Sequence, residues 1–151
     1  MATFPPVNTV VASPADVIPT WFRDYTLQDA ILSEPSRWIF CFSSGASILV
    51  ECLWRIADSN SIKLTSEDHQ QKFGHPTPID ACVRVKELLQ DSRVVELSAD
   101  PHTFDLTIAF SNRLRLEILV DSTGYESWKI EAPNGTCIVA QGGGQLCKFE
   151  S

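Results

Sequence analysis

Alternating apolar and polar residues predict β-strands along most of the chain. The strongest run, SILVECLWRIA from Ser47 to Ala57, is apolar on one face and half apolar on the other. A strand of this kind is expected in the interior of a sheet, with a neighbour on each side. Shorter runs bounded by turn residues predict further strands over residues 25–33, 37–43, 62–64, 93–97, 103–110, 114–120, 126–131 and 136–141.

One segment has helical spacing instead. It follows Thr77 and Pro78, and it predicts a helix over about residues 78–90 that packs on a sheet through one apolar face. That face consists of Ala81, Cys82, Val85, Leu88 and Leu89. Upstream, Thr65 and Asp68 have the spacing of a capping box, which predicts a single helical turn. The fold class is therefore predicted as α+β, with a mostly antiparallel, strongly twisted sheet of about six to eight strands.

The chain divides into three parts: a Pro-rich N-terminal arm over residues 1–24, one α+β domain over 25–147 and a tail over 148–151. One helical turn is expected within the arm, from Ala15 to Phe22. The run Gly142 to Gly144 is expected to end the last strand. Because sheet edges invite pairing, the arm is expected to cover one edge, in its own chain or across a two-fold axis. A homodimer is therefore expected.

Two segments echo each other along the sequence. Residues 38–56 and 106–130 each run strand, FS turn, strand, tryptophan, basic residue and isoleucine. Two interpretations stay open: a duplicated hairpin unit, or the general similarity of hairpins with buried aromatic residues.

Composition and charge narrow the function classes. The 151 residues, 44% apolar and 21% charged, fit one globular domain. The formal net charge of −7 opposes binding to nucleic acid and to an anionic membrane. Five cysteines without a CxxC pair indicate buried thiols, and we find neither a leader pattern nor a membrane-spanning run, so a cytoplasmic location is expected.

The polar clusters of the sequence carry weak chemical signals. Glu67, Asp68, His69 and His75 could offer metal ligands, but their spacing fits a capped turn better, and no metal site or cofactor is expected. No nucleophile motif accompanies the histidines, so no catalytic residue is assigned. Glu51 and Glu117 could face each other across strands. The commoner explanation is ion pairing with neighbouring arginines, which are Arg55, Arg113 and Arg115.

The stretch DSTGYESWKIEAPNG, from Asp121 to Gly135, has two interpretations. In the structural one, Trp128 packs beside Trp54, Tyr125 closes a sheet corner, and Glu126 pairs with a cation such as Arg55; Gly124 supplies a backbone conformation that other residues resist. In the functional one, aromatic and polar side chains surround a mouth between the two hairpin units. The candidate ligand- or partner-binding residues are Arg55, Asp68, His69, Tyr125, Glu126 and Trp128.

Several blocks carry a resemblance to a family of small bacterial proteins of unknown function. They are VECLWRI, LTSEDHQQKFGHPTPIDA, DLTIAFSNRLRLEIL, STGYESW and IVAQGGGQL, spread over residues 25 to 147. Some members resemble immunity proteins that neutralise toxins. This chain departs from the pattern at Thr123, and at His75 with Thr77. The resemblance implies no catalytic chemistry.

Two functions remain open. The first is a non-enzymatic intracellular interaction domain, immunity-like in style, whose acidic surface meets a basic protein partner. The second is a small-ligand-binding protein or hydrolase with a site near the GYESW and SEDH segments.

Overall fold

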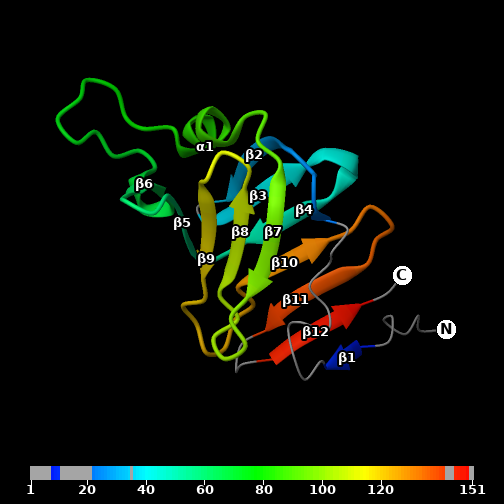
Figure 1. Cartoon of the computed structure of the whole chain (residues 1–151). Helices are drawn as coiled ribbons and strands as arrows, with labels where there is room; N and C mark the ends of the chain where they lie inside the picture. The colour runs from blue at the N-terminus through cyan, green and yellow to red at the C-terminus, as the bar shows by residue number, and fades with distance from the viewer. Residues whose placement is uncertain (1–7, 11–21, 35, 142–144, 150–151) are drawn as a thin grey trace.

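The computed structural model describes residues 8–10, 22–34, 36–141 and 145–149. These residues form two antiparallel sheets and one α-helix (Figure 1). The seven-stranded sheet has the order β1 (Asn8–Val10), β12 (Gln145–Phe149), β11 (Cys137–Gln141), β10 (Trp128–Glu131), β4 (Ser47–Val50), β3 (Arg37–Phe42), β2 (Leu27–Glu34). The five-stranded sheet has the order β6 (Ile62–Thr65), β5 (Leu53–Ala57), β9 (Arg115–Leu119), β8 (Leu106–Phe110), β7 (Val94–Ala99).

The α+β class is confirmed, but the prediction of a single sheet is wrong. The run from Ser47 to Ala57, predicted as one interior strand, breaks at Glu51 and Cys52. Its first half is β4 in the seven-stranded sheet, and its second half is β5 in the five-stranded sheet. The chain therefore crosses from one sheet to the other within this run.

The alternation of buried residues continues through this crossing without a change of phase. Each of the five residues on the inward face is buried, namely Ile48, Val50, Cys52, Trp54 and Ile56. The apolar pattern of a strand that bends between two sheets is therefore the same as that of one continuous strand. For this reason the sequence pattern could not reveal the second sheet.

Aromatic packing joins the two sheets in one core. The centroid of the Trp54 ring on β5 lies 5.1 Å from that of the Trp38 ring and 5.3 Å from that of the Phe40 ring, both on β3. Both ring pairs meet edge to face, at 86°. Since β3 and β5 belong to different sheets, these contacts hold the sheets against each other.

The sheets also meet at a second corner, next to β2 and β7. Thr26 and Arg93 form an antiparallel bridge between the starts of these strands. The Val94 backbone N–H donates to the Tyr25 carbonyl, and the Asp24 N–H donates to the Val94 carbonyl, each at 2.8 Å. The two sheets are thus linked on both sides of the core.

The helix α1 (Ala81–Leu89) contacts the edge strands β2 and β6. It begins three residues later than predicted because Asp80 is its N-cap: the Asp80 carboxylate accepts from the N–H groups of Cys82 and Val83, at 3.0 and 3.2 Å. The predicted apolar face is directed inward. Ala81, Val85 and Leu89 are buried on it.

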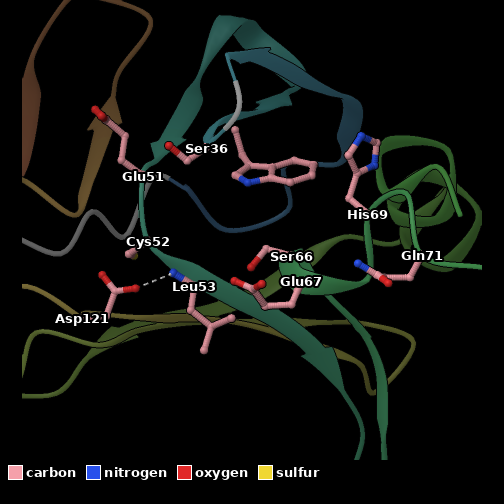
Figure 2. A pocket seen from close by; sticks show the side chains of 10 residues that line it. Ser36, Glu51, Cys52, Leu53, Ser66, Glu67, His69, Gln71 and Asp121 are labelled. Atoms are coloured by element: carbon pink, nitrogen blue, oxygen red, sulfur yellow. Dashed lines mark hydrogen bonds between the residues drawn. The ribbon is translucent and has the colours of Figure 1, made fainter.

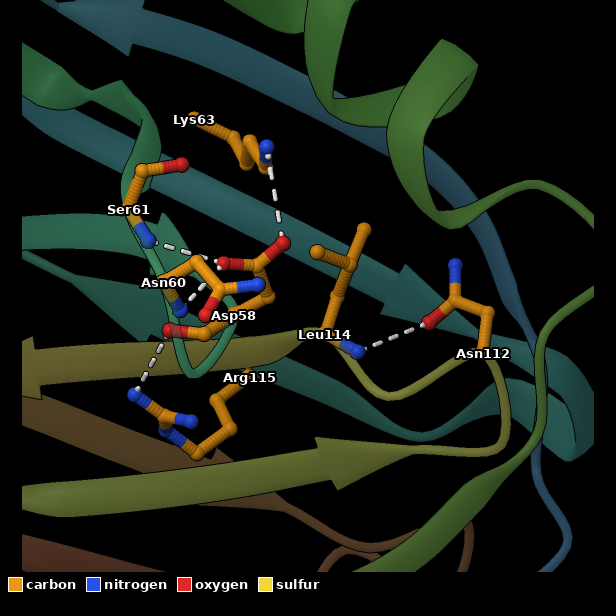
Figure 3. A network of polar contacts seen from close by, with 7 residues as sticks. All are labelled: Asp58, Asn60, Ser61, Lys63, Asn112, Leu114 and Arg115. Atoms are coloured by element: carbon orange, nitrogen blue, oxygen red, sulfur yellow. Dashed lines mark hydrogen bonds and ion pairs between the residues drawn. The ribbon is translucent and has the colours of Figure 1, made fainter.

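Polar side chains set the turns of the five-stranded sheet (Figure 3). The Asp58 carboxylate accepts from the N–H groups of Asn60 and Ser61, both at 2.8 Å, and lies 3.4 Å from Lys63 Nζ. The two backbone hydrogen bonds hold the pKa of Asp58 below its usual value. Arg115 on β9 donates to the Asp58 carbonyl at 3.4 Å, which fastens the β5–β6 turn to the sheet.

Both predicted hairpin turns of the second half are present. Asn112 accepts from the Leu114 N–H at 3.1 Å and donates to the Leu88 carbonyl at 2.9 Å, so it connects the β8–β9 turn to α1. Gly135, with a φ of 90°, turns the chain between β10 and β11.

The strand β12 was not predicted. It pairs with β11 and includes Lys148 and Phe149, which the sequence analysis assigned to a tail. Its adjacent residues Leu146 and Cys147 are both buried, which differs from the alternation by which the other strands were predicted. The glycine run and the helical turn expected in the arm lie outside the described residues, but β1 of the arm pairs with β12 of its own chain.

The two echoing segments have reciprocal places in the fold. In each segment a hairpin, β3–β4 or β8–β9, precedes a third strand in the other sheet, β5 or β10. Each third strand pairs with the second strand of the other segment, β5 with β9 and β10 with β4. The registers are not identical, because Trp54 lies opposite Ile118 whereas Trp128 lies opposite Val50.

The burial of β12 makes the end of the chain part of the core. Leu146→Ala is expected to lower the free energy of unfolding by about 2–5 kcal/mol, because it removes a fully buried side chain. The control Gln145→Ala, at an exposed neighbouring position, should change it by less than about 0.5 kcal/mol. Urea denaturation followed by circular dichroism measures both. Equal stability of the two variants would contradict the place of β12 in the core.

Candidate functional site

The six candidate residues do not form one cluster, and Arg55 and Trp128 belong to the scaffold. Arg55 on β5 pairs with Glu117 on β9, with 2.9 Å between Nε and Oε1. The expected pairing of Glu126 with Arg55 is therefore wrong. Glu117 lies opposite Arg55 and Thr107, so its carboxylate does not face Glu51. Its interaction is the cross-strand ion pair with Arg55.

Trp128 is a core residue. Only 1% of its surface is exposed, and its indole N–H donates to the Phe104 carbonyl at 2.8 Å. Among the described residues, the Trp54 ring contacts the rings of Trp38 and Phe40 and not that of Trp128, so the expected packing of Trp128 beside Trp54 is not found. Trp128 therefore anchors the end of the GYESW segment in the core.

Asp68 and His69 end a capped turn that leads toward α1. The predicted capping box is confirmed: the Asp68 carboxylate accepts from the Thr65 N–H at 2.9 Å, and Thr65 Oγ1 accepts from the Glu67 N–H at 3.2 Å. His69 Nδ1 accepts from the Ala81 N–H at 3.1 Å. The neutral imidazole then carries its hydrogen on Nε2, and its ring meets Trp38 edge to face at 5.5 Å.

Two hollows adjoin at the corner where the chain crosses between the sheets. The first has a volume of about 330 Å³, and its wall includes Trp38, Glu67 and His69 (Figure 2). The second has a volume of about 400 Å³ and is lined in part by Tyr125 and Glu126. Both are also lined by Glu51 and Asp121. We call the two hollows together the acidic groove, after its carboxylates Glu51, Glu67, Asp121 and Glu126.

The groove therefore brings together only some of the predicted residues. His69 lines the first hollow, whereas Tyr125 and Glu126 line the second. Arg55 and Trp128 line neither hollow, and Asp68 lies in the turn behind the first. The SEDH and GYESW segments thus both contribute to the groove, but Arg55, Asp68 and Trp128 do not line it.

Backbone hydrogen bonds shape the corner at the centre of the groove. The Glu51 N–H donates to the Ser127 carbonyl at 2.9 Å, and the Leu53 N–H donates to the Asp121 carboxylate at 3.3 Å (Figure 2). Ser122 Oγ accepts from the Tyr125 N–H at 3.0 Å. This turn holds Tyr125 outward, with 80% of its surface exposed.

Gly124 does not have the expected strained backbone. Its φ lies outside the left-handed region, and an added Cβ would meet no atom within 4 Å. The turn is held by Ser122, whose hydroxyl also accepts from the Gly124 N–H at 3.1 Å. The prediction for Gly124 is therefore wrong, and the turn needs no glycine at this position.

The groove carries an excess of negative charge. Among the described residues, one of its carboxylates forms an ion pair. This pair is long, with 3.9 Å between Arg37 Nη2 and Glu51 Oε2. Glu67, Asp121 and Glu126 form no ion pair with any described residue. Like charges with so little compensation produce a negative potential that favours a cation in the groove.

Trp38 places a hydrogen-bond donor at the first hollow. Only 4% of its surface is exposed, and its indole N–H makes no hydrogen bond with any described residue. The polar side-chain atoms sealed from solvent without a partner, among the described residues, are Arg37 Nε and Trp54 Nε1. The Trp38 indole N–H is therefore reachable from the hollow and can donate to a bound molecule.

Cys52 lines the first hollow as an unreactive thiol. Burial raises its pKa to about 12, and the nearby carboxylates of Asp121, Asp105 and Glu51 act in the same direction. A thiol with this pKa stays protonated at neutral pH. Of the five cysteines predicted to be buried, only Cys52 and Cys147 are buried, and the others are half-buried. Among the described residues, no group of three His, Cys, Asp or Glu side chains is arranged to hold a metal ion.

Sequence reasoning missed Trp38 and Asp121 as groove residues and placed Glu51 elsewhere. A signal for two of them was present in the echoing segments, where ILV precedes Glu51 in one and Asp121 in the other. Because both ILV runs end at a sheet corner, both carboxylates arrive at the same groove. No comparable signal separated Trp38 from the other core aromatic residues.

The contrast between Trp128 and Glu126 can be tested by stability. Trp128→Ala should lower the free energy of unfolding by roughly 3–5 kcal/mol, because it empties a core position and unpairs the Phe104 carbonyl. Glu126→Gln should change it by less than about 0.5 kcal/mol. Urea denaturation measures both, and Trp128→Phe should lose less than Trp128→Ala. A fully stable Trp128→Ala would show that this residue is not in the core.

The Cys52 thiol should resist alkylation. Its pKa of about 12, against an ordinary 9.0, makes the reactive thiolate about 1,000-fold rarer. Because the fold favours the protonated thiol, this stabilisation is complete below pH 9 and is lost as the pH rises toward 12. Iodoacetamide labelling at about pH 8, with peptide mass mapping, should find Cys52 modified only after unfolding. Rapid labelling of the folded protein would contradict the raised pKa.

No protein-family model, curated protein or solved structure matches the chain. The functional argument therefore starts from the acidic groove itself.

Proposed function

We propose that the protein is a non-enzymatic binding domain that holds a basic segment of a protein partner in the acidic groove. The observation that carries this proposal is the convergence of four carboxylates on one groove, with a single long ion pair among the described residues to offset them. A lysine or arginine side chain would supply the missing positive charge. Long-range attraction would also speed its association.

The aromatic residues of the groove suit the same ligand. Tyr125 is highly exposed beside Glu126, and protein interfaces are enriched in tyrosine and tryptophan. The face of an aromatic ring also attracts ammonium and guanidinium groups. A basic side chain entering the second hollow would meet a carboxylate and a ring together.

The chemistry of the groove favours binding over catalysis. A nucleophile must be deprotonated or held against a base. The Cys52 thiol stays protonated, and His69 Nδ1 already accepts the Ala81 N–H. Hydrolysis therefore has little support from these residues.

A second candidate, a small cationic ligand, is favoured by one specific observation. The first hollow combines a volume of about 330 Å³ with the reachable Trp38 indole N–H. Small-molecule sites have this size and a few convergent polar groups. An amine that also carries a hydrogen-bond acceptor would fit these walls.

Other expectations belong to the same proposal. An immunity-like role would use the groove to bind a basic toxin. The five free cysteines support a cytoplasmic location, and no helix among the described residues is long and apolar enough to cross a membrane. The reciprocal strand pairing of the two echoing segments supports duplication of one hairpin unit, which would make Glu51 and Asp121 equivalent.

Short peptides of equal length test the proposal. Lysine- and arginine-containing peptides should bind in low salt, and matched glutamate-containing peptides should not, as measured by calorimetry. Glu67→Gln combined with Glu126→Gln should weaken binding about 5- to 10-fold, since each exposed charge pair contributes about 0.5–0.7 kcal/mol.

The control separates the groove from the net charge. Two neutralisations at exposed positions outside the groove, Glu96→Gln and Glu131→Gln, remove the same charge and should leave binding unchanged. An equal loss in both double variants would reject the groove as the site. Binding of small amines without binding of peptides would favour the second candidate.

A further inference from the structure

The connection between the turn that ends at Asp68 and α1 forms an ordered, projecting loop. Residues 70–79, here called the Phe73 loop, reach away from both sheets (Figure 1). The Gln70 N–H donates to the Ile79 carbonyl at 2.8 Å, and the Ile79 N–H donates to the Gln71 carbonyl at 2.9 Å. These bonds close the base of the loop.

Phe73 stands at the tip in an unfavourable conformation. Its φ is 47°, in the left-handed region that bulky residues rarely adopt, and 66% of its surface is exposed. The backbone hydrogen bond from His75 N–H to the Lys72 carbonyl, at 2.9 Å, closes the turn around it. Strained backbone positions cluster at functional sites, and exposed aromatic residues including Phe are enriched in protein interfaces.

The charge of the loop is opposite to that of the groove. Residues 70–79 contain Lys72 and His75 but no Asp or Glu, in a chain whose formal net charge is −7. The acidic groove offers carboxylates together with the exposed ring of Tyr125. The loop thus has both the cation and the aromatic side chain for which the groove is suited.

The loop and the groove also adjoin each other in the fold. His69 and Gln71 line the first hollow, and the loop begins between them at Gln70. A two-fold axis beside this boundary would place each loop over the groove of the other copy, and such an exchange closes after two copies. The described strand of the N-terminal arm, β1, pairs with β12 of its own chain, at the opposite edge of the seven-stranded sheet from β2.

We propose that the Phe73 loop of one copy enters the acidic groove of a second copy, so that the protein forms a two-fold homodimer. The inference rests on the proposed function, because the loop is the basic segment that the groove holds when no other partner is bound. A foreign basic partner would then compete with the loop. Dimerisation would cover the groove until such a partner arrives.

Charge reversal on both sides tests the dimer. Lys72→Glu and Glu67→Lys change two exposed side chains for which the structure gives no ion pair among the described residues, so both variants should fold. Light scattering and sedimentation over a concentration series should show a dimeric wild type. Each variant alone should have a dimer dissociation constant at least about 10-fold higher, because like charges meet at both contacts.

The mixture of the two variants gives the decisive result. In the mixed dimer, the glutamate introduced by Lys72→Glu in one copy meets the lysine introduced by Glu67→Lys in the other. The remaining contact is native, so an equimolar mixture should dimerise again. Phe73→Ala should weaken the dimer, and the control Lys129→Glu, outside the loop and the groove, should remain dimeric. A monomeric wild type at all concentrations, or a mixture that stays monomeric, would overturn the inference.

The outcomes also separate this inference from the proposed function. A monomeric wild type that still binds basic peptides through Glu67 and Glu126 would reject the dimer alone. A loop-dependent dimer that neither binds basic peptides nor dissociates in their presence would support the inference and reject the proposed function.

Discussion

The packing of Trp54 against Trp38 and Phe40 joins the two sheets, and the shape of the groove depends on it. Trp54 follows the crossing at Glu51 and Cys52 directly, so the chain must bend there while its inward face stays in the core. The buried Trp54 indole N–H has no hydrogen-bond partner among the described residues, at a cost of about 1–3 kcal/mol. Apolar contact with rings on the opposite sheet outweighs that cost.

A groove at this corner follows from the geometry of two sheets that are joined by a run of chain bending from one into the other. Where β4 ends and β5 begins, the neighbouring strands separate, and side chains at the strand ends line the space between them. Glu51 follows β4 and Asp121 lies just after β9, so both carboxylates reach the same opening. The capped turn at Ser66–Asp68 closes one side, and the backbone N–H of Trp54 donates to Ser66 Oγ at 3.2 Å, which joins that turn to the core.

The local elements could be predicted because their signals are local. Helix α1, the capping box of Thr65 and Asp68, and the turns at Asn112 and Gly135 depend on residues within a few positions of each other. The second sheet could not be predicted, since a strand that bends between sheets keeps the same alternation as a straight one. Strand β12 depends on a long-range partner for its burial. The ion pairs Arg55–Glu117 and Arg37–Glu51 depend on which strands become neighbours. The candidate site was therefore predicted by segment, at SEDH and GYESW, but not by its central carboxylates.

Under the proposed function, structural and binding roles are divided among the acidic residues around the groove. Asp68 caps a turn, and Asp121 accepts the Leu53 N–H, so both carboxylates help to hold the walls in place. Glu67 and Glu126 form no hydrogen bond through their side chains with any described residue, although each is on a wall that backbone hydrogen bonds fix. A preorganised wall with unsatisfied acceptors at its rim loses little conformational freedom when a cation binds. The same division means that neutralising a rim glutamate changes the binding potential of the groove while the corner that forms it stays intact.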